Sequence, residues 1–230
     1  MTADVARPVR LLSYNVLSLR MSVPALVAVI TGCRPDVLCL QEAPRFLFWR
    51  RRLARLASAT GLRVVAGHRR AGAVAVLIGP DVALLAAAEL RLPWQVGRHR
   101  RGVATVLLGV HGRRFAVTSV HLSLSGDERR AHLPLILTAA EQYGGPVVIA
   151  GDINEEDSGD VWIELARRYQ DAYAVAPAGE GATFSAQHPR TRIDGVFADR
   201  SIRVIDAGVP EVPGIAEASD HRPVLARLSV

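Results

Sequence analysis

One stretch of the sequence reads Pro146-Val147-Val148-Ile149-Ala150-Gly151-Asp152-Ile153-Asn154. An apolar run between a proline and a glycine is typical of a short strand buried on both faces, and such a strand gives way to polar residues at a sheet edge. With strand alternation, Asp152 and Asn154 point to the same side. A carboxylate there can take a proton or hold a cation, and an amide can donate to a phosphate oxygen. The stretch therefore predicts either a site for phosphoryl chemistry or a plain strand end before a turn.

The length and composition favour one globular domain. The chain has 230 residues, 50% of them hydrophobic, and no Pro/Gly/Ser-rich linker divides it, so we expect a single domain over residues 1–230. Its apolar runs are shorter than the roughly 20 residues that cross a bilayer, and the N-terminus lacks the apolar core of a signal peptide. We therefore expect a soluble, cytoplasmic and monomeric protein. Cys33 and Cys39 have neither disulfide-framework nor zinc-ligand spacing, which predicts core thiols.

The charge balance points to anionic partners, with a reservation. A formal net charge of +6 favours nucleic acid, phospholipid headgroups or phosphorylated metabolites. The sequence contains no lysine, so all 28 basic residues are arginine. Because a codon-biased genome also produces such a composition, the charge by itself is a modest argument for a polyanionic substrate.

The predicted elements alternate between strands and helices. Residues 9–16 and 36–42 are expected to be strands joined by a helix that Ser22 caps, which is the sequence form of a βαβ-like unit. A hairpin is predicted for residues 102–121, turning at His111-Gly112, and a long helix for residues 127–143. The segment 174–192, rich in Gly, Pro and Ala, is expected to be an irregular loop.

Polar residues that can bind metals or transfer protons lie at the ends of these predicted elements. They are Asn15, Glu42, His121, Asp152, Asn154, Asp194, Asp220 and His221. Loops are polar in any protein, which explains some of this pattern. Carboxylate and amide oxygens select a hard cation, so the set predicts Mg²⁺ or Mn²⁺ and disfavours structural zinc.

The order of these motifs resembles the endonuclease/exonuclease/phosphatase superfamily. The matching pieces span nearly the whole chain: Tyr14-Asn15, Leu40-Gln41-Glu42, Val120-His121-Leu122, Gly151-Asp152-Ile153-Asn154, Arg192-Ile193-Asp194 and Ser219-Asp220-His221-Arg222-Pro223-Val224. The resemblance implies a four-layer α/β sandwich. In this fold two mostly antiparallel β-sheets pack together, helices flank them, and the site lies at one edge of the sheets.

The resemblance also implies roles for these residues. Glu42 would be the principal Mg²⁺ ligand, with Asn15 and Asp220 near the cation. Asp152 would orient or deprotonate the attacking water, and Asn154 would hold a phosphate oxygen. His221, steadied by Asp194, would stabilise the transition state, and His121 stands where the deoxyribonucleases of the superfamily use a histidine. These roles suit phosphoryl transfer, which asks mostly for positioning and for charge that faces the phosphate.

Three departures from the superfamily pattern bear on the substrate. AP endonucleases carry a tyrosine where this chain has His121, so abasic-site incision is disfavoured. Deoxyribonucleases orient their histidine with a glutamate that would fall near Ala66-Gly67-His68, where no acid stands, so the protonation state of His121 is an open question. Gly195 replaces the aromatic residue that is common after Arg-Ile-Asp, and we expect it to open the floor of the site.

The function predicted from these features is divalent-metal-dependent hydrolysis of a phosphodiester, most readily in nucleic acid, by metal-assisted in-line attack of water. Arginines expected to flank the site, in the segment 98–101 and at Arg190 and Arg192, could neutralise successive phosphates. The first alternative is a phosphatase or phosphodiesterase of phospholipid, inositol phosphate or other small phosphate esters. The second is a non-catalytic binding module of the same fold.

Overall fold

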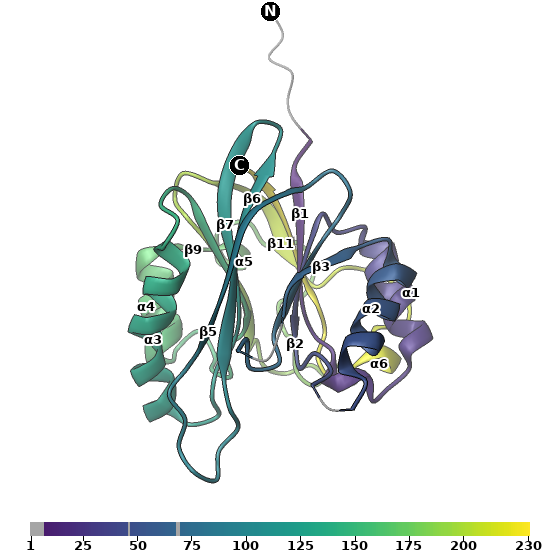
Figure 1. Cartoon of the computed structure of the whole chain (residues 1–230), viewed down its shortest axis with the longest axis horizontal. Helices are drawn as coiled ribbons and strands as arrows, with labels where there is room; N and C mark the ends of the chain where they lie inside the picture. The colour runs from purple at the N-terminus through teal and green to yellow at the C-terminus, as the bar shows by residue number, and fades with distance from the viewer. Residues whose placement is uncertain (1–6, 46, 68–69) are drawn as a thin grey trace, which may run out of the picture.

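A computed structural model of the chain describes residues 7–45, 47–67 and 70–230. Two six-stranded β-sheets pack face to face, and helices cover the outer face of each (Figure 1). Each sheet has one parallel pair, β1 with β2 and β7 with β8, and its other pairs are antiparallel. The α/β sandwich predicted from the sequence is confirmed.

The first sheet has the order β11-β12-β1-β2-β4-β3. Its strands are β1 (Val9–Asn15), β2 (Val37–Gln41), β3 (Arg63–Ala66), β4 (Ala75–Ile78), β11 (Arg203–Gly208) and β12 (Val224–Ser229). The second sheet has the order β5-β6-β7-β8-β10-β9. Its strands are β5 (Ala83–Arg91), β6 (Gly102–Val110), β7 (Arg113–His121), β8 (Val147–Asp152), β9 (Gln170–Asp171) and β10 (Asp194–Ala198).

The helices form the two outer layers. The first sheet is covered by α1 (Val23–Cys33), α2 (Trp49–Thr60) and the short α6 (Ile215–Ala218), and the second by α3 (Gly126–Glu141) and α4 (Asp160–Arg168) (Figure 1). One further helical turn is α5 (Ala172–Val175), and a 3₁₀ turn spans Leu17–Leu19. Ser22 caps α1 as predicted, because its hydroxyl accepts a hydrogen bond from the backbone N–H of Ala25 at 3.3 Å.

Strand alternation divides the apolar residues into three buried layers. In β1, Leu11 packs between the sheets, whereas Leu12 and Tyr14 pack under α1 and α2. In β8, Val148 and Ala150 face the other sheet, whereas Val147 and Ile149 pack under α3 and α4. Because the side-chain period is two, Asn15 and Asp152 continue the rows that face the opposite sheet.

The sequence predictions for the elements agree with the structure except at their ends. The hairpin of β6 and β7 turns at His111-Gly112, and the segment 174–192 is largely irregular. The long helix begins at Gly126 and ends at Glu141, slightly before the predicted end. Cys33 and Cys39 are free and buried, and burial raises the pKa of Cys33 to about 11, so both are core thiols as predicted.

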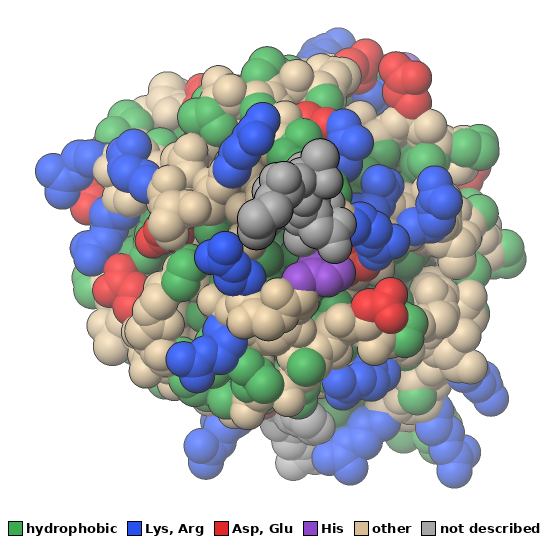
Figure 2. Space-filling view, turned by 90° about the horizontal axis from the view of Figure 1, so that it is seen from above, with side chains coloured by type: hydrophobic (Ala, Val, Ile, Leu, Met, Phe, Trp, Pro, Cys, Tyr) green, Lys and Arg blue, Asp and Glu red, His purple; other side chains and the backbone are tan. Residues whose placement is uncertain are grey.

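Arginine side chains are not confined to the edge at which β1 ends. Figure 2 shows the opposite edge, where β1 begins, and arginines are spread over it among acidic and apolar side chains. Their distribution on this face agrees with the view that the net charge by itself is only a modest argument for a polyanionic substrate. Among the described residues, no helix combines the length and the apolar character needed to traverse a lipid bilayer.

Candidate active site

Strand register brings most of the predicted residues to one edge of the sandwich. Asp152 at the end of β8 lies opposite His121 at the end of β7 and opposite Asp194 at the start of β10. Asn15 ends β1 in the facing sheet, and its amide Nδ2 donates a hydrogen bond to Asp152 Oδ2 at 3.0 Å. The four side chains are buried, so the two sheets jointly enclose a polar site at this edge.

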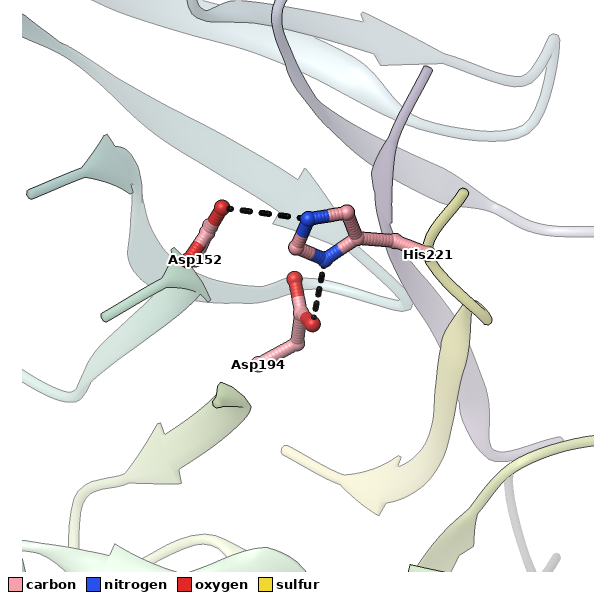
Figure 3. A group of neighbouring side chains, drawn as sticks. All are labelled: Asp152, Asp194 and His221. Atoms are coloured by element: carbon pink, nitrogen blue, oxygen red, sulfur yellow. Dashed lines mark hydrogen bonds and ion pairs between the residues drawn. The ribbon is translucent and has the colours of Figure 1, made fainter. Parts of the chain in front are cut away.

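Asp152, Asp194 and His221 form the centre of the site (Figure 3). His221 Nδ1 lies 2.9 Å from Asp194 Oδ2, and its Nε2 lies 3.8 Å from Asp152 Oδ2. One potential ligand atom from each of these residues lies within 4.8 Å of the others, so the group could hold one metal ion. The second oxygen of Asp194, Oδ1, is buried without a hydrogen-bond partner in the described structure.

Burial and neighbouring charges shift the pKa values of this group in opposite senses. Burial, reinforced by the charge of Asp194, raises the pKa of Asp152 to about 7. Burial disfavours protonation of His221, but the charge and hydrogen bond of Asp194 outweigh it and raise the pKa of His221 to about 9. At neutral pH His221 is therefore an imidazolium beside a carboxylate that can exchange its proton.

His121 is neutral in this arrangement. Its Nε2 lies 3.3 Å from Asp152 Oδ2, whereas its Nδ1 is buried without a hydrogen-bond partner in the described structure. Burial lowers the pKa of His121, and the positive charges of Arg101 and His221 lower it further. The superfamily glutamate expected near Ala66-Gly67-His68 has no counterpart at Ala66 or Gly67, and His68 lies outside the described residues. His121 is thus set to donate to Asp152 rather than to act as an acid.

The residues predicted to bind the metal converge on the same edge through local hydrogen bonds. Ser219 Oγ donates to the backbone oxygen of Asn15 at 2.7 Å and lies 3.3 Å from Asp220 Oδ1. The backbone oxygen of Glu42 accepts from Ser18 N at 2.8 Å, which holds Glu42 beside the segment that follows Asn15. Glu42 has φ +50°, an unfavourable conformation for glutamate and one that is concentrated at functional sites.

Asn154 departs from the arrangement that strand alternation predicts. β8 ends at Asp152, and Asn154 adopts a left-handed conformation with φ +55°, so the two side chains do not follow the strand period. Instead, the backbone N–H of Asn154 donates to Asp152 Oδ1 at 2.9 Å, and its side-chain Nδ2 donates to Leu122 O at 3.0 Å. One N–H of the Asn154 amide is therefore committed to the protein.

Part of the predicted irregular loop forms a wall of the site. Thr183 is buried, and its Oγ1 accepts hydrogen bonds from the backbone N–H groups of Ile193 and Asp194 at 3.2 and 3.3 Å. The ring of Phe184 packs against the ring of His221 with a centroid distance of 4.9 Å. Both residues position the Asp194–His221 pair. Composition marks this segment only as a loop, so sequence reasoning missed them.

Arg101 belongs to the segment 98–101 that is expected to flank the site, and the structure buries its side chain. It precedes β6, is 8% exposed, and its buried Nε has no hydrogen-bond partner in the described structure. Burial lowers the pKa of its guanidinium, while the charges of Asp152 and Glu42 act in the opposite direction. A buried guanidinium whose charge acts on two carboxylates of the site can bind an anion near them.

Two predictions about neighbouring residues are corrected by the structure. Arg192 does not face the site as a free cation, because it donates to Asp171 and Asp157 and lies over the rings of Trp162 and Tyr173. Gly195 does not open the floor of the site. A Cβ at this position would meet the rings of Phe197 and Trp162 at 2.8 and 2.9 Å, so these rings fill the space on the helix side of β10.

The sequence profile of the Endonuclease/Exonuclease/phosphatase family matches residues 12–221, which include every predicted site residue. The chain belongs to this family. No curated protein matches it significantly. Among solved structures it is similar to an endonuclease/exonuclease/phosphatase from Beutenbergia cavernae, with 24% identity over 97% of this chain and 72% of that one, at a TM-score of 0.76.

Two other structures share the fold across almost their whole length. A mannosyl-6-phosphatase from Bacteroides thetaiotaomicron is 19% identical, covers 96% of this chain and 100% of its own, and has a TM-score of 0.80. The human nocturnin catalytic domain with bound sulfate is also 19% identical, with coverages of 99% and 96% and a TM-score of 0.71. The family is one of hydrolytic phosphoesterases.

Proposed function

We propose that this protein is a divalent-metal-dependent hydrolase of phosphodiesters in nucleic acid. The observation that carries the proposal is the buried pairing of Asp152 with an imidazolium at His221, held at the edge where both sheets end. One group can take a proton near neutral pH, and the other carries a fixed positive charge. Hydrolysis of a phosphate ester needs both.

Each of the following residues has its own role in the reaction. Asp152 accepts the proton of a water molecule whose oxygen attacks phosphorus in line, and the bond from phosphorus to the departing oxygen breaks. The imidazolium of His221 and the guanidinium of Arg101 face the oxygens on which negative charge develops. Asn15 donates to Asp152, and His121 Nε2 lies 3.3 Å from the same carboxylate oxygen, so both side chains hold this carboxylate in place.

The donor set fits a hard divalent cation. Glu42, Asn15 and Asp220 offer oxygen atoms, and hydrogen bonds through Ser219 and Ser18 hold them together at the site edge. The protonated state of His221 makes it a poor ligand, so we assign the cation to these oxygens rather than to the group that contains His221. When bound, Mg²⁺ or Mn²⁺ would supply Lewis-acid stabilisation of a phosphate oxygen.

Arginine side chains near the site favour nucleic acid as the substrate. Arg45, Arg98 and Arg100 lie around one cleft next to Arg101, so several phosphates of one strand could be neutralised. Small phosphate esters are the alternative, and the fold shared with a mannosyl-6-phosphatase favours them. Salt dependence distinguishes the two, because a nuclease that holds several phosphates releases counterions along the strand.

We expect DNA or RNA cleavage to weaken by about tenfold or more in kcat/KM between about 50 and 200 mM salt, while hydrolysis of a small phosphate ester changes little. The double variant Arg98→Gln/Arg100→Gln should show a shallower salt dependence. Arg113→Gln/Arg114→Gln is the matched control, because these residues begin β7 at the opposite edge. Hydrolysis of mannose 6-phosphate or inositol phosphates without any cutting of nucleic acid would reverse the assignment.

The Asp194→Asn variant should lose less turnover than His221→Ala. Asp194 acts through His221, so an asparagine that still accepts the Nδ1 hydrogen bond keeps the ring in place while the pKa of His221 falls. Single-turnover rates of the two variants, measured at saturating substrate and metal, give the order. A greater loss in Asp194→Asn would mean that Asp194 contacts the substrate or metal directly.

A further inference from the structure

A cleft with a volume of about 490 Å³ opens beside the catalytic group. The described residues that line it come from residues 43–45 after β2, the first residue of α2, residues 67 and 72–73 between β3 and β4, and the β5–β6 connection. The residues that matter for its chemistry are Arg45, Trp49, Trp94, Arg98, His99 and Arg100. Its volume falls in the range of roughly 300–1,000 Å³ that is usual for small-ligand sites.

The lining of the cleft adjoins the site along the chain. Its lining residue Ala43 follows Glu42, and Arg100 precedes the buried Arg101. Arg45 and His99 are close enough to His121 for their charges to lower its pKa. The backbones of two lining connections touch, since Gly72 has φ +64° and a Cβ there would lie 2.2 Å from Gly102 N. The cleft is therefore near enough to the site to receive a substituent of a phosphate held there.

The cleft combines indole rings with cations. The guanidinium of Arg100 lies 4.7 Å from the ring centroid of Trp94, and Trp94 Nε1 donates to the backbone oxygen of Arg98 at 2.6 Å, which fixes the ring within its loop. Trp94 is 41% exposed, so part of the indole ring is open to a ligand. Aromatic and guanidinium planes stack on the π-faces of unpaired bases.

The residues that line the cleft disfavour other chemical groups attached to the phosphate. None of the described lining residues is Asp, Glu, Asn or Gln, so the cleft has few side-chain acceptors for the hydroxyl groups of a sugar. The arginines disfavour a cationic headgroup such as choline. A base pair within a duplex is shielded on both faces by stacking and cannot enter a cleft of this size. One unpaired base attached to a phosphate meets all three conditions.

We propose that the Trp49–Trp94 cleft binds the base of an unpaired nucleotide whose phosphate ester lies at the Asp152–His221 group. This inference rests on the proposed function and narrows its substrate class to single-stranded ends and nucleotide esters. Trp94 is then a specificity-determining residue, and Arg100 fixes its ring.

The test compares two esters with the same leaving group, the p-nitrophenyl ester of thymidine 5′-monophosphate and methyl p-nitrophenyl phosphate. Trp94→Ala should lower kcat/KM for the thymidine ester by about tenfold or more, the usual effect of losing one stacking ring, and leave the methyl ester unchanged. Trp94→Phe should retain most of the preference. Val96→Ala is the matched control, because Val96 lies in the same connection, is 90% exposed and does not line the cleft.

A binding measurement separates the cleft from catalysis. Without added metal, thymidine 5′-monophosphate should quench tryptophan fluorescence saturably, and ribose 5-phosphate should not. Trp162 is buried and serves as an internal reference. Nucleotide binding without hydrolysis of any ester would retain the cleft and reject the proposed function, whereas hydrolysis of both esters with no effect of Trp94→Ala would do the reverse.

Two further substrates distinguish a nucleotide at the end of a nucleic-acid strand from a free nucleotide ester. Cleavage of a single-stranded oligonucleotide in preference to its duplex would identify a nucleic-acid end, and cleavage of a dinucleotide alone would identify a free nucleotide ester. Both results agree with an unpaired base in the cleft. Preference for the duplex, equal binding of ribose 5-phosphate, or an equal loss on both chromogenic esters in Trp94→Ala would overturn the proposal.

Discussion

Replacement of Asp152 by asparagine should lower turnover by about a hundredfold or more, the usual scale for removing a positioned base. Asparagine is close to isosteric, and its one carbonyl oxygen can still accept from either Asn15 or the backbone N–H of Asn154, but it cannot take a proton from water. His221→Ala should cause a loss of similar size, because it removes the fixed positive charge next to Asp152. Single-turnover kinetics at saturating substrate measures both effects without a contribution from product release.

The stability of Asp152→Asn provides the control for folding. The pKa of Asp152 is raised in the folded state to about 7, so the folded protein binds more protons than the unfolded chain and loses stability as pH rises from about 4 to 7. The asparagine variant lacks this loss. Without metal, its melting temperature should therefore fall less between about pH 4 and 7 than that of the wild type. Near-normal turnover in a folded Asp152→Asn protein would remove Asp152 from the role of base.

Strand periodicity accounts for the part of the site that the sequence could predict. Asn15, His121, Asp152 and Asp194 each lie at a strand terminus in a row of residues that faces the opposite sheet. The alternation of these residues with buried apolar residues is visible in the sequence. The order of the motifs indicates the superfamily fold, and the fold determines which strands pair. Asp220 and His221 precede β12, which pairs with β1 and so returns them to Asn15.

The rest of the site depends on contacts that periodicity does not encode. The left-handed backbone of Asn154 turns its amide toward Leu122, and no local pattern distinguishes that conformation from a continued strand. Arg101 and Arg192 are both arginines beside predicted strands. Tertiary contacts alone pair Arg192 with Asp171 and bury Arg101 where the charges of Asp152 and Glu42 act on it.

Gly195 illustrates the same limit for a missing side chain. The absence of an aromatic residue after Arg-Ile-Asp suggests an open floor, but the outcome depends on which face of β10 the position occupies. Position 195 lies on the helix side, where Trp162 and Phe197 pack edge to face with a centroid distance of 5.1 Å. Large residues from elsewhere in the chain therefore fill the space.

Removal of divalent metal should abolish activity, and added Mg²⁺ or Mn²⁺ should restore it. The site holds Asp152 and Asp194 buried beside each other, and Glu42 and Asp220 lie half-buried at the same edge. The positive charges of His221 and Arg101 offset these carboxylates in part, and a divalent cation would relieve the remaining repulsion. Full activity in excess EDTA would show that the reaction needs no metal.

The Glu42→Gln variant should require about tenfold or more Mg²⁺ for half-maximal activity, because a neutral amide replaces the expected principal carboxylate ligand. Metal binding can be measured apart from activity as the rise in melting temperature with Mg²⁺ or Mn²⁺, and this rise should shrink in Glu42→Gln. Glu211→Gln is the matched control, since Glu211 is exposed and lines a separate cleft beside α6. An unchanged metal-dependent stabilisation in Glu42→Gln, together with its loss in Asp194→Asn, would move the cation to the group formed by Asp152, Asp194 and His221.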